Sequence, residues 1–361
     1  MHRSLTALDR AGGRGAPGTP GARPPASGGR SVRRRLLWSA LCVALLALSC
    51  AASLLLGSAR LPMSTVWTAL TSPEQGIDHL TVLSLRVPRT ILGVLVGAAL
   101  GAAGALAQAL TRNPLADPGI LGVNAGAALA IAVGVAALGV TRLHQYLWLG
   151  FAGALGATAL VYLIAARGPG GATPLRLTLV GVALGAVFTG AASTLSLMDP
   201  MAFDRMRHWG AGTLADRPED TAATIAPFVL AGLVAALALA RPLNALALGD
   251  ELARAVGARV ALTRGCGVVV IAVLCGAATA AAGPIGFVGL MVPHAVRLLT
   301  GPDQRWILPF TLVLAPVLLL VSDVIGRLVV WPAELQVGVI TALLGAPVLI
   351  LLVRRAKAGA P

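Results

Sequence analysis

Charged side chains are scarce in this sequence. Only 12% of its 361 residues are Asp, Glu, Lys or Arg, whereas 57% are hydrophobic, and the mean hydropathy is +0.84. A typical soluble domain has about 25% charged residues. The composition therefore excludes an ordinary soluble domain and indicates a polytopic membrane protein.

The residue types that form metal sites and active sites are also few. The five histidines are scattered singly, and the four cysteines form no CxxC or Cys/His pattern, so neither type suggests a metal site or a disulfide framework. No GxxxxGK[ST] motif is present, and the chain has no ATP site of its own. The sequence thus predicts a protein that is not an enzyme, with no catalytic residue, metal or cofactor.

Ionisable groups are almost missing from the centres of the apolar segments. A proton- or sodium-coupled transporter needs such a group near the bilayer midplane to bind the coupling ion. Asp323 lies near a segment end, where we expect it to pair with Arg327. An ion-coupled secondary transporter is therefore the less favoured interpretation.

Long apolar runs are what the sequence does contain. Each is close to the roughly 20 residues that cross a membrane as a helix. They are continuously apolar and do not alternate as barrel strands would, so we predict an all-α bundle of about ten transmembrane helices. The predicted segments are 36–57, 90–110, 118–140, 145–166, 177–198, 221–240, 265–282, 284–300, 306–329 and 334–353.

The basic residues lie mostly in the N-terminal tail and in short loops. Their net charge of +14 is explained by membrane topology better than by nucleic acid. Residues 1–35 are rich in Gly, Pro, Ala, Ser and Arg and are predicted to be a disordered tail. The run 36–57 is longer than a signal h-region and no A-x-A site follows it, which favours a retained first helix. Ten crossings then place both termini in the cytoplasm.

Three arginines depart from the positive-inside pattern. Arg86 and Arg89, before the second segment, and Arg327, at the end of the ninth, fall on the outside. An acidic partner on the external side is one explanation for them.

Small residues form stripes on two segments. In the second, Gly93, Gly97, Gly101 and Gly104 favour close helix packing within one subunit over a dimer contact. In the fifth, glycines and hydroxyls share a face, which suits a translocation path and close helix packing equally. The residues of that face are Gly181, Gly185, Thr189, Ser193 and Ser196.

The longest internal loop, 241–264, has a helical pattern. Acidic Asp250 and Glu251 suit a first turn, apolar Leu252, Ala255 and Val256 share a face, and Gly257 can end the helix. Docking to a partner and lying on the headgroups are equally compatible with this pattern.

The polar stretch "TRNPLADPGILGVNAGA", residues 111–127, is expected to be a tight internal turn. Pro114 and Pro118 would end one helix and begin the next, because proline suits a first helical turn. Asn113 and Asp117 precede them, where their side chains can cap backbone N–H groups.

Four motifs together resemble one family. They are "RVPRTILGVLVGAALGAAGALAQALTRNPLADPGILGVNAGA", "LGDELARAVGARV", "GPIGFVGLMVPHAVRLLTGPDQRWILP" and "ELQVGVITALLGAPVLILLVRR". In this order they resemble the permease subunits of FecCD-type ABC importers, which take up ferric siderophores, haem and cobalamin. The resemblance covers about residues 36–357, the expected permease domain.

The resemblance implies a type II ABC importer permease fold in a bacterial cell membrane. A second permease subunit, identical or paralogous, would complete the path. Two ATPase subunits would dock inside, and a substrate-binding lipoprotein or periplasmic protein outside. An iron-siderophore chelate is the expected cargo, with haem or cobalamin as alternatives. A membrane scaffold or enzyme is a third class of function, and it would show no substrate flux.

The resemblance also assigns residues. The coupling helix for the ATPase would comprise Gly249, Asp250, Glu251, Leu252, Ala253, Arg254 and Gly257, with Asp250 where the family more often has glutamate. Arg86, Arg89 and Arg327 would meet glutamates of the binding protein. The fifth segment would line the path and lead to a short external helix near Trp209, where this sequence departs from the bulkier family pattern.

Overall fold

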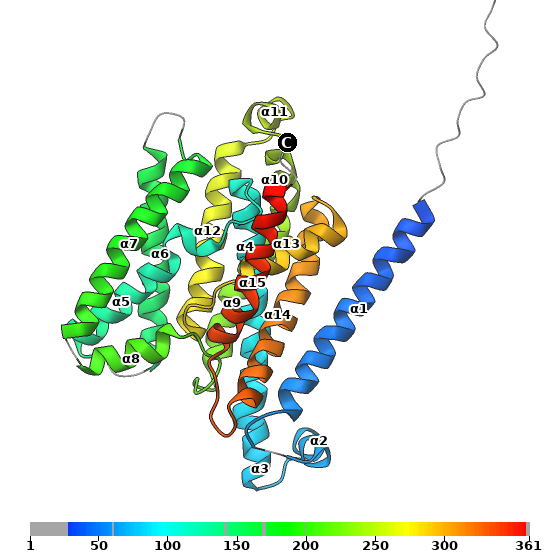
Figure 1. Cartoon of the computed structure of the whole chain (residues 1–361), viewed down its shortest axis with the longest axis vertical. Coiled ribbons are helices and arrows are strands. Elements are labelled where there is room, and N and C mark those ends of the chain that lie inside the picture. Colours follow the sequence, from blue (N-terminus) through cyan, green and yellow to red (C-terminus); the bar gives the residue numbers. More distant parts are fainter. Residues whose placement is uncertain (1–27, 60, 141–142, 168–170, 199, 359–361) are drawn as a thin grey trace, which may run out of the picture. The chain divides into compact units, whose positions relative to one another are not determined.

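The computed structural model describes residues 28–59, 61–140, 143–167, 171–198 and 200–358. Regular structure in this part of the chain is entirely helical, without a strand, as predicted (Figure 1). The chain divides into two units, Met1–Ser39 and Ala40–Pro361. The second unit holds every predicted site residue. Most of the predicted disordered tail falls on residues 1–27, which lie outside the described residues.

Ten apolar helices match the ten predicted segments. Seven are long enough to cross a membrane and three are shorter, within the described residues. The long ones are α1 (Gly28–Leu55), α4 (Val87–Thr111), α6 (Leu143–Ala166), α7 (Pro174–Met198), α9 (Thr221–Ala238), α12 (Val260–Ala282) and α14 (Gln304–Val329). The shorter ones are α5 (Val123–Leu138), α13 (Val288–Thr300) and the apolar part Val337–Leu351 of α15 (Val337–Ala358).

Short helices connect these segments. α8 (Pro200–Gly210) occupies the place expected for a short helix after the fifth segment. α2 (Met63–Thr71), α3 (Ile77–Leu80) and the π-helical turn η1 (Thr81–Arg86), which runs directly into α4, were not predicted. α10 (Ala240–Leu246) and α11 (Asp250–Ala255) divide the long internal loop.

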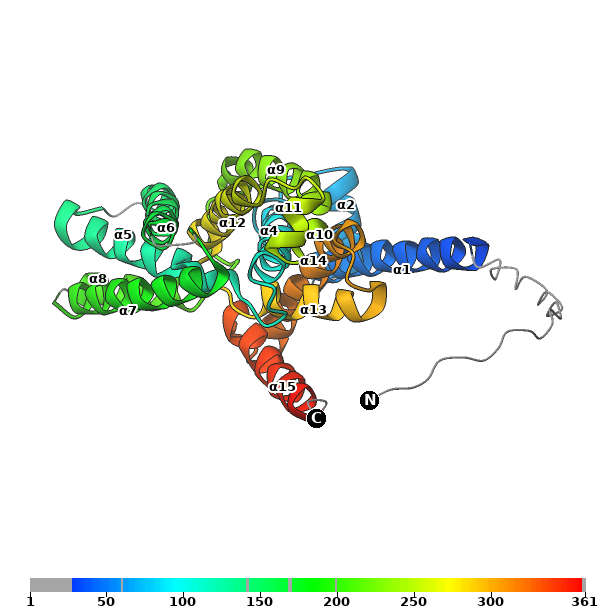
Figure 2. The ribbon, with the colours of Figure 1, turned by 90° about the horizontal axis from the view of Figure 1, so that it is seen from above.

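Helix α4 lies among α9, α12, α13 and α14 (Figure 2). Its glycine stripe explains how neighbours come so close. A Cβ on Gly97 would lie 2.6 Å from the Pro316 Cα on α14, and one on Gly104 would lie 1.9 Å from the Gly289 carbonyl oxygen on α13. The predicted packing within one subunit is confirmed.

Helices α5 and α13 begin partway along the bundle. Gly289, in the first turn of α13, packs on Gly104, well before the end of α4. Pro118, which opens the 3-10 turn η2 (Pro118–Leu121) before α5, lies against the same Gly289. Pro118 and Gly289 are both buried, so protein covers the backbone at these two helix starts, the condition under which a membrane bundle tolerates irregular structure.

The bundle has two distinct ends. α10 and α11 lie at one end, with the last turn of α4 and the start of α12; we name it the α11 end (Figure 1). The start of α4, the end of α14 and the start of α15 lie together at the other, which we name the Arg89 end. The start of α14 is bonded to Asn244 of α10. Helices α4 and α14 therefore each run from one end to the other, as a membrane crossing requires.

Candidate functional site

Two glycines delimit α11. Gly249 precedes it with φ of 101°, and Gly257 follows it with φ of 83°, both in a region that side chains with a Cβ rarely adopt. The Gly257 N–H bonds to the Arg254 carbonyl at 2.9 Å, and the Ala258 N–H bonds to the Ala253 carbonyl at 2.8 Å. This pair of bonds is a Schellman motif, so the predicted helix end at Gly257 is confirmed.

The outer face of α11 is apolar and uncovered. Leu252 is 59% exposed and Val256 is 65% exposed, with exposed Leu248 just before the helix, whereas Ala253 is fully buried beneath them. Glu251 and Arg254 flank this strip and are also exposed. Exposed apolar side chains bordered by charges are typical of a protein-interaction surface.

Asp250 is tied to two other elements. Its carboxylate is ion-paired with Arg112, in the turn after α4, and with Arg264 on α12 at 2.9 Å. Burial alone would raise the pKa of Asp250, but the positive charges of Arg264 and Arg112 outweigh it and hold that pKa below its ordinary value. α11 is therefore anchored, through one carboxylate, to both α4 and α12.

The polar turn after α4 is built as its sequence suggested. The Leu115 N–H bonds to the Asn113 side chain at 2.9 Å, and the Gly119 N–H bonds to the Asp117 side chain at 2.7 Å. One expectation is corrected, because Pro118 opens a 3-10 turn and α5 starts only at Val123. The 3-10 turn η2 therefore precedes α5, and Pro118 does not begin α5 directly.

The predicted path residues on α7 separate into two groups. Thr189 and Ser193 are exposed on the single chain, and a Cβ at Gly185 would meet nothing within 4 Å. Gly181 instead packs on the Ile120 carbonyl, and the Ser196 hydroxyl donates to the Ala192 carbonyl at 2.8 Å. The first group can line a surface between subunits, whereas the second supports packing inside this chain.

Arg86 and Arg327 are buried, with exposed fractions of 5% and 2%. Arg86 donates to the carbonyls of Leu54, Leu55 and Ala59. Arg327 donates to the Ser53 carbonyl at 2.8 Å and to that of Leu56 at 3.1 Å. Both guanidinium groups thus bond to carbonyls in the last turn of α1, which have no partner within the helix, and in the segment just after it.

Arg89 completes this network. Its guanidinium grips Asp323 with two bonds of 2.7 and 3.0 Å and reaches Glu334 at 2.7 Å. Asp323, which is 1% exposed, is also ion-paired with Arg327, so the predicted Asp323–Arg327 pair is confirmed. The three arginines expected to stand out toward a partner are mostly engaged within the chain.

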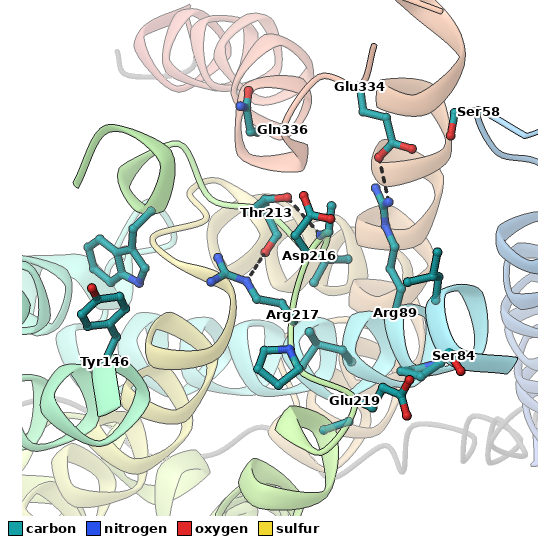
Figure 3. Close-up of a pocket in the computed structure, with 18 of the residues that line it drawn as sticks. Ser58, Ser84, Arg89, Tyr146, Thr213, Asp216, Arg217, Glu219, Glu334 and Gln336 are labelled. Atoms are coloured by element: carbon teal, nitrogen blue, oxygen red, sulfur yellow. Dashed lines mark hydrogen bonds and ion pairs between the residues drawn. The ribbon is translucent and has the colours of Figure 1, made fainter. Parts of the chain in front are cut away.

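A cavity of about 750 Å³ opens beside Arg89 (Figure 3). Residues from the α8–α9 loop line it, together with Glu334 and Tyr146. Arg217 of that loop was not singled out from the sequence. Counting the basic residues of every external loop, and not only those nearest the helix ends, would have found it.

Family and structural comparisons agree with this geometry. A model of the FecCD transport family matches residues 45–355. The ferric enterobactin transport system permease protein FepD of Escherichia coli (strain K12) is 50% identical over 87% of this chain and 94% of its own length. The hemin transport system permease protein HmuU of Yersinia pestis is 35% identical over 84% of this chain and 90% of its own.

A solved structure has the same fold. The inward-facing conformation of a metal-chelate type ABC transporter superposes with a TM-score of 0.77 and 27% identity, over 87% of this chain and 97% of that one. A multi-pass helical chain with an exposed α11 is thus a type II ABC importer permease in architecture. The chain belongs to the FecCD transport family.

Proposed function

We propose that this protein is the permease subunit of an ATP-driven importer for iron-siderophore chelates. The observation that carries the proposal is α11, a rigidly capped helix whose apolar face is exposed and whose base is anchored to two long helices. The similarity to FepD supports a ferric siderophore as cargo.

α11 is the coupling helix in this proposal. Leu252 and Val256 would fill a groove of the ATPase, and Glu251 and Arg254 would make polar contacts at its rim. Movement of the ATPase would pass through Asp250 to α4 and α12. ATP hydrolysis itself would take place in a separate subunit, two copies of which serve the complex.

The orientation follows from this role. The α11 end would face the cytoplasm, together with both chain termini, and the Arg89 end would face the outside of a bacterial cell or inner membrane. The loops of the α11 end carry Arg112, Arg241 and Arg259, in accord with the positive-inside rule.

A second permease subunit, identical or paralogous, would complete the translocation path. The exposed face of α7, with Gly185, Thr189 and Ser193, would line it. Gly181 and Ser196 would support α7 through packing and hydrogen bonding inside the chain, without contacting the cargo. An extracytoplasmic substrate-binding protein would dock on the Arg89 end, with Arg89 at the cavity edge and Arg86 and Arg327 fixing the end of α1 beneath it.

Transport measurements test this function. The chain, a matching ATPase and a binding protein are reconstituted in proteoliposomes, and ATP-dependent uptake of a radioactive ferric catecholate is followed. If haem, and not an excess of unlabelled siderophore, inhibits this uptake, the proposed cargo would change to haem, which the name of the relative HmuU suggests. Uptake without the ATPase but driven by an ion gradient would refute the importer proposal.

A further inference from the structure

Helix α2 has an exposed apolar stripe at the Arg89 end of the bundle (Figure 1). Met63, Trp67 and Leu70 follow one another at steps of four and three residues, so they lie on one face of the helix. Their exposed fractions are 72%, 67% and 44%, so the part of the chain that the structure describes leaves this stripe uncovered. Large apolar side chains gathered on one exposed face indicate a partner outside the chain.

The other faces of α2 have a different character. Val66 is 3% exposed and Ala69 is fully buried, and both lie about a quarter of a turn from the apolar stripe. A third face is exposed and polar, and it consists of Ser64, Thr68 and Thr71. A helix with one buried face, one apolar exposed face and one polar exposed face is suited to a boundary between lipid and water.

The buried face fixes the height of α2 in the membrane. Leu54 and Leu55 of α1 pack against the small cluster that this face forms with Val82. Leu55 ends the span Leu37–Leu55, whose 19 residues extend about 28 Å, close to the thickness of the hydrocarbon core. Figure 1 shows α2 nearly end-on, so it runs across the direction of α4. α2 thus lies crosswise at the level where α1 leaves the hydrocarbon core.

Other exposed tryptophans lie at the same end of the bundle. Trp331 is 56% exposed, and its indole N–H donates to the carbonyl of Ser58, in the connection between α1 and α2, at 2.9 Å. Trp148 is 44% exposed and follows Tyr146, which lines the cavity beside Arg89, by two residues. Tryptophan is enriched where a membrane meets water, because its ring is apolar and its N–H needs an acceptor. Together with Trp67, these two residues are typical of the aromatic belt at a membrane surface.

The sequence around α2 has no positive charge that could attract acidic headgroups. Residues 61–85 contain no Lys or Arg, and their only acidic residues are Glu74 and Asp78. The electrostatic attraction that holds a basic helix on anionic lipid is therefore absent. Burial of the apolar stripe is the contribution that remains, and it does not require a charged lipid. Because only residues 56–62 connect α1 to α2, the stripe stays close to a helix that already faces lipid along most of its span.

We propose that α2 lies on the surface of the bilayer, with Met63, Trp67 and Leu70 inserted at the boundary between headgroups and acyl chains. The polar face remains among the hydrated headgroups. The partner is the lipid surface itself, and electrically neutral lipids suffice. α2 then holds the end of α1 and the start of α4 at a fixed height in the membrane. This inference requires only a chain that spans the membrane, and it goes beyond the proposed importer function.

Spin labels on α2 provide the test. The whole chain is placed in phosphatidylcholine nanodiscs after its four native cysteines have been changed to Ala. A nitroxide is attached to a single new cysteine on the stripe, in Met63→Cys, Trp67→Cys or Leu70→Cys. The matched controls carry the label on the polar face of the same helix, in Ser64→Cys, Thr68→Cys and Thr71→Cys. The collision rate of each nitroxide with oxygen, which concentrates in lipid, is divided by its collision rate with a water-soluble nickel chelate.

We expect this oxygen-to-nickel ratio to be about threefold or more higher on the stripe than on the polar face, and to stay the same at high salt. A second measurement keeps the native cysteines. Tryptophan fluorescence is quenched by phosphatidylcholine brominated near the headgroup end of its acyl chains. Trp67→Phe should lose part of this quenching, whereas Trp209→Phe, at a position only 6% exposed, should lose none.

Other outcomes overturn the proposal. Equally low ratios on both faces, or quenching that Trp67→Phe leaves unchanged, would place the stripe in water. Equally high ratios on both faces would place α2 inside the bilayer and not on its surface. Labels on the stripe that the nickel chelate reaches until a substrate-binding protein is added would assign the stripe to protein docking. ATP-dependent uptake is measured separately, so failure of this proposal would leave the importer function standing.

Discussion

The guanidinium of Arg112 is ion-paired with the carboxylate of Asp250, although 138 positions separate them in the chain. Arg112 closes α4 in a left-handed conformation, with φ of 51°, and Asp250 opens α11. The pair joins the polar turn after α4 to the proposed coupling helix. Because the turn continues directly into the covered segment before α5, a shift of α11 can reach the interior of the bundle through one contact.

Replacing Asp250 with Asn should separate ATP hydrolysis from transport. The change keeps the size of the side chain but removes its charge, so the bonds to Arg112 and Arg264 weaken. The pair with Arg112 is partly exposed, and such pairs stabilise by only about 0–1 kcal/mol. Arg264 is buried, but the Asn side chain keeps an oxygen that can accept its hydrogen bond, so the fold should survive. We expect three- to tenfold less iron taken up per ATP hydrolysed. Asp78→Asn, an exposed carboxylate on α3, should leave that ratio unchanged.

The pH dependence of this contact has a definite sign. The pKa of Asp250 is held below its ordinary value, so its contribution to stability is fully present above about 3.8 and is lost as the pH falls through the lowered value. Coupling should therefore not change with pH near neutrality on account of Asp250. A loss of coupling in the neutral range that Asp250→Asn abolishes would contradict this assignment.

Charges on the exposed face of α11 should prevent assembly with the ATPase. Leu252→Glu or Val256→Glu would place a carboxylate in the proposed contact with the ATPase, where the surface of α11 is apolar. Burial of an unpaired charge is strongly unfavourable, so we expect the ATPase to be lost when the permease is purified through an affinity tag. Ile77→Glu, at a position 84% exposed on α3, is the control and should retain the ATPase.

The bundle itself could be predicted because its physics is local. About twenty apolar residues in succession can satisfy their backbone in lipid only as a helix, and the segments ending at Thr111, Ala166 and Val329 lie close to their predicted bounds. α2 and η1 could not be foreseen, since their residues have neither a long apolar run nor a strong turn signal. The start of α5 was misplaced because proline suits a first turn in both α and 3-10 helices.

Site residues were predictable only where the signal was in the adjacent sequence. Gly249 and Gly257 bracket α11 within one short loop, and their role follows from the chain alone. The partners of Arg86 and Arg89 come from α1, α14 and the segment before α15, which no local pattern brings together. Because both arginines lie at the predicted external end, the sequence suggested that they are exposed. Instead, Arg86 hydrogen-bonds to free carbonyls at the end of α1, and Arg89 pairs with the Asp323 carboxylate.

Adding a methyl group to a glycine should lower thermal stability on α4, where the glycine packs on another helix, but not on the exposed face of α7 proposed to line the path. Gly104→Ala would place its Cβ 1.9 Å from the Gly289 carbonyl oxygen, so α13 must move away. Overpacking of this kind costs about 1–3 kcal/mol, and we expect a lower midpoint of thermal unfolding in detergent. Gly185→Ala, where nothing lies within 4 Å, is the matched control and should unfold like the unchanged chain. Equal midpoints for the two variants would contradict the packing described for α4.

Asp323→Asn tests whether the Arg89 network serves stability or docking. The carboxylate is 1% exposed and balances both Arg89 and Arg327, so its neutralisation leaves two largely buried cations with only Glu334 nearby. Breaking a buried pair in this way destabilises by about 3–5 kcal/mol, and we expect poor yield and a clearly lower unfolding midpoint. Asp204→Asn, at an exposed carboxylate on α8, controls for loss of a charge at the same end. If these arginines instead existed to hold acids of the binding protein, Asp323→Asn would release them, and the measured affinity for that protein would rise without loss of stability.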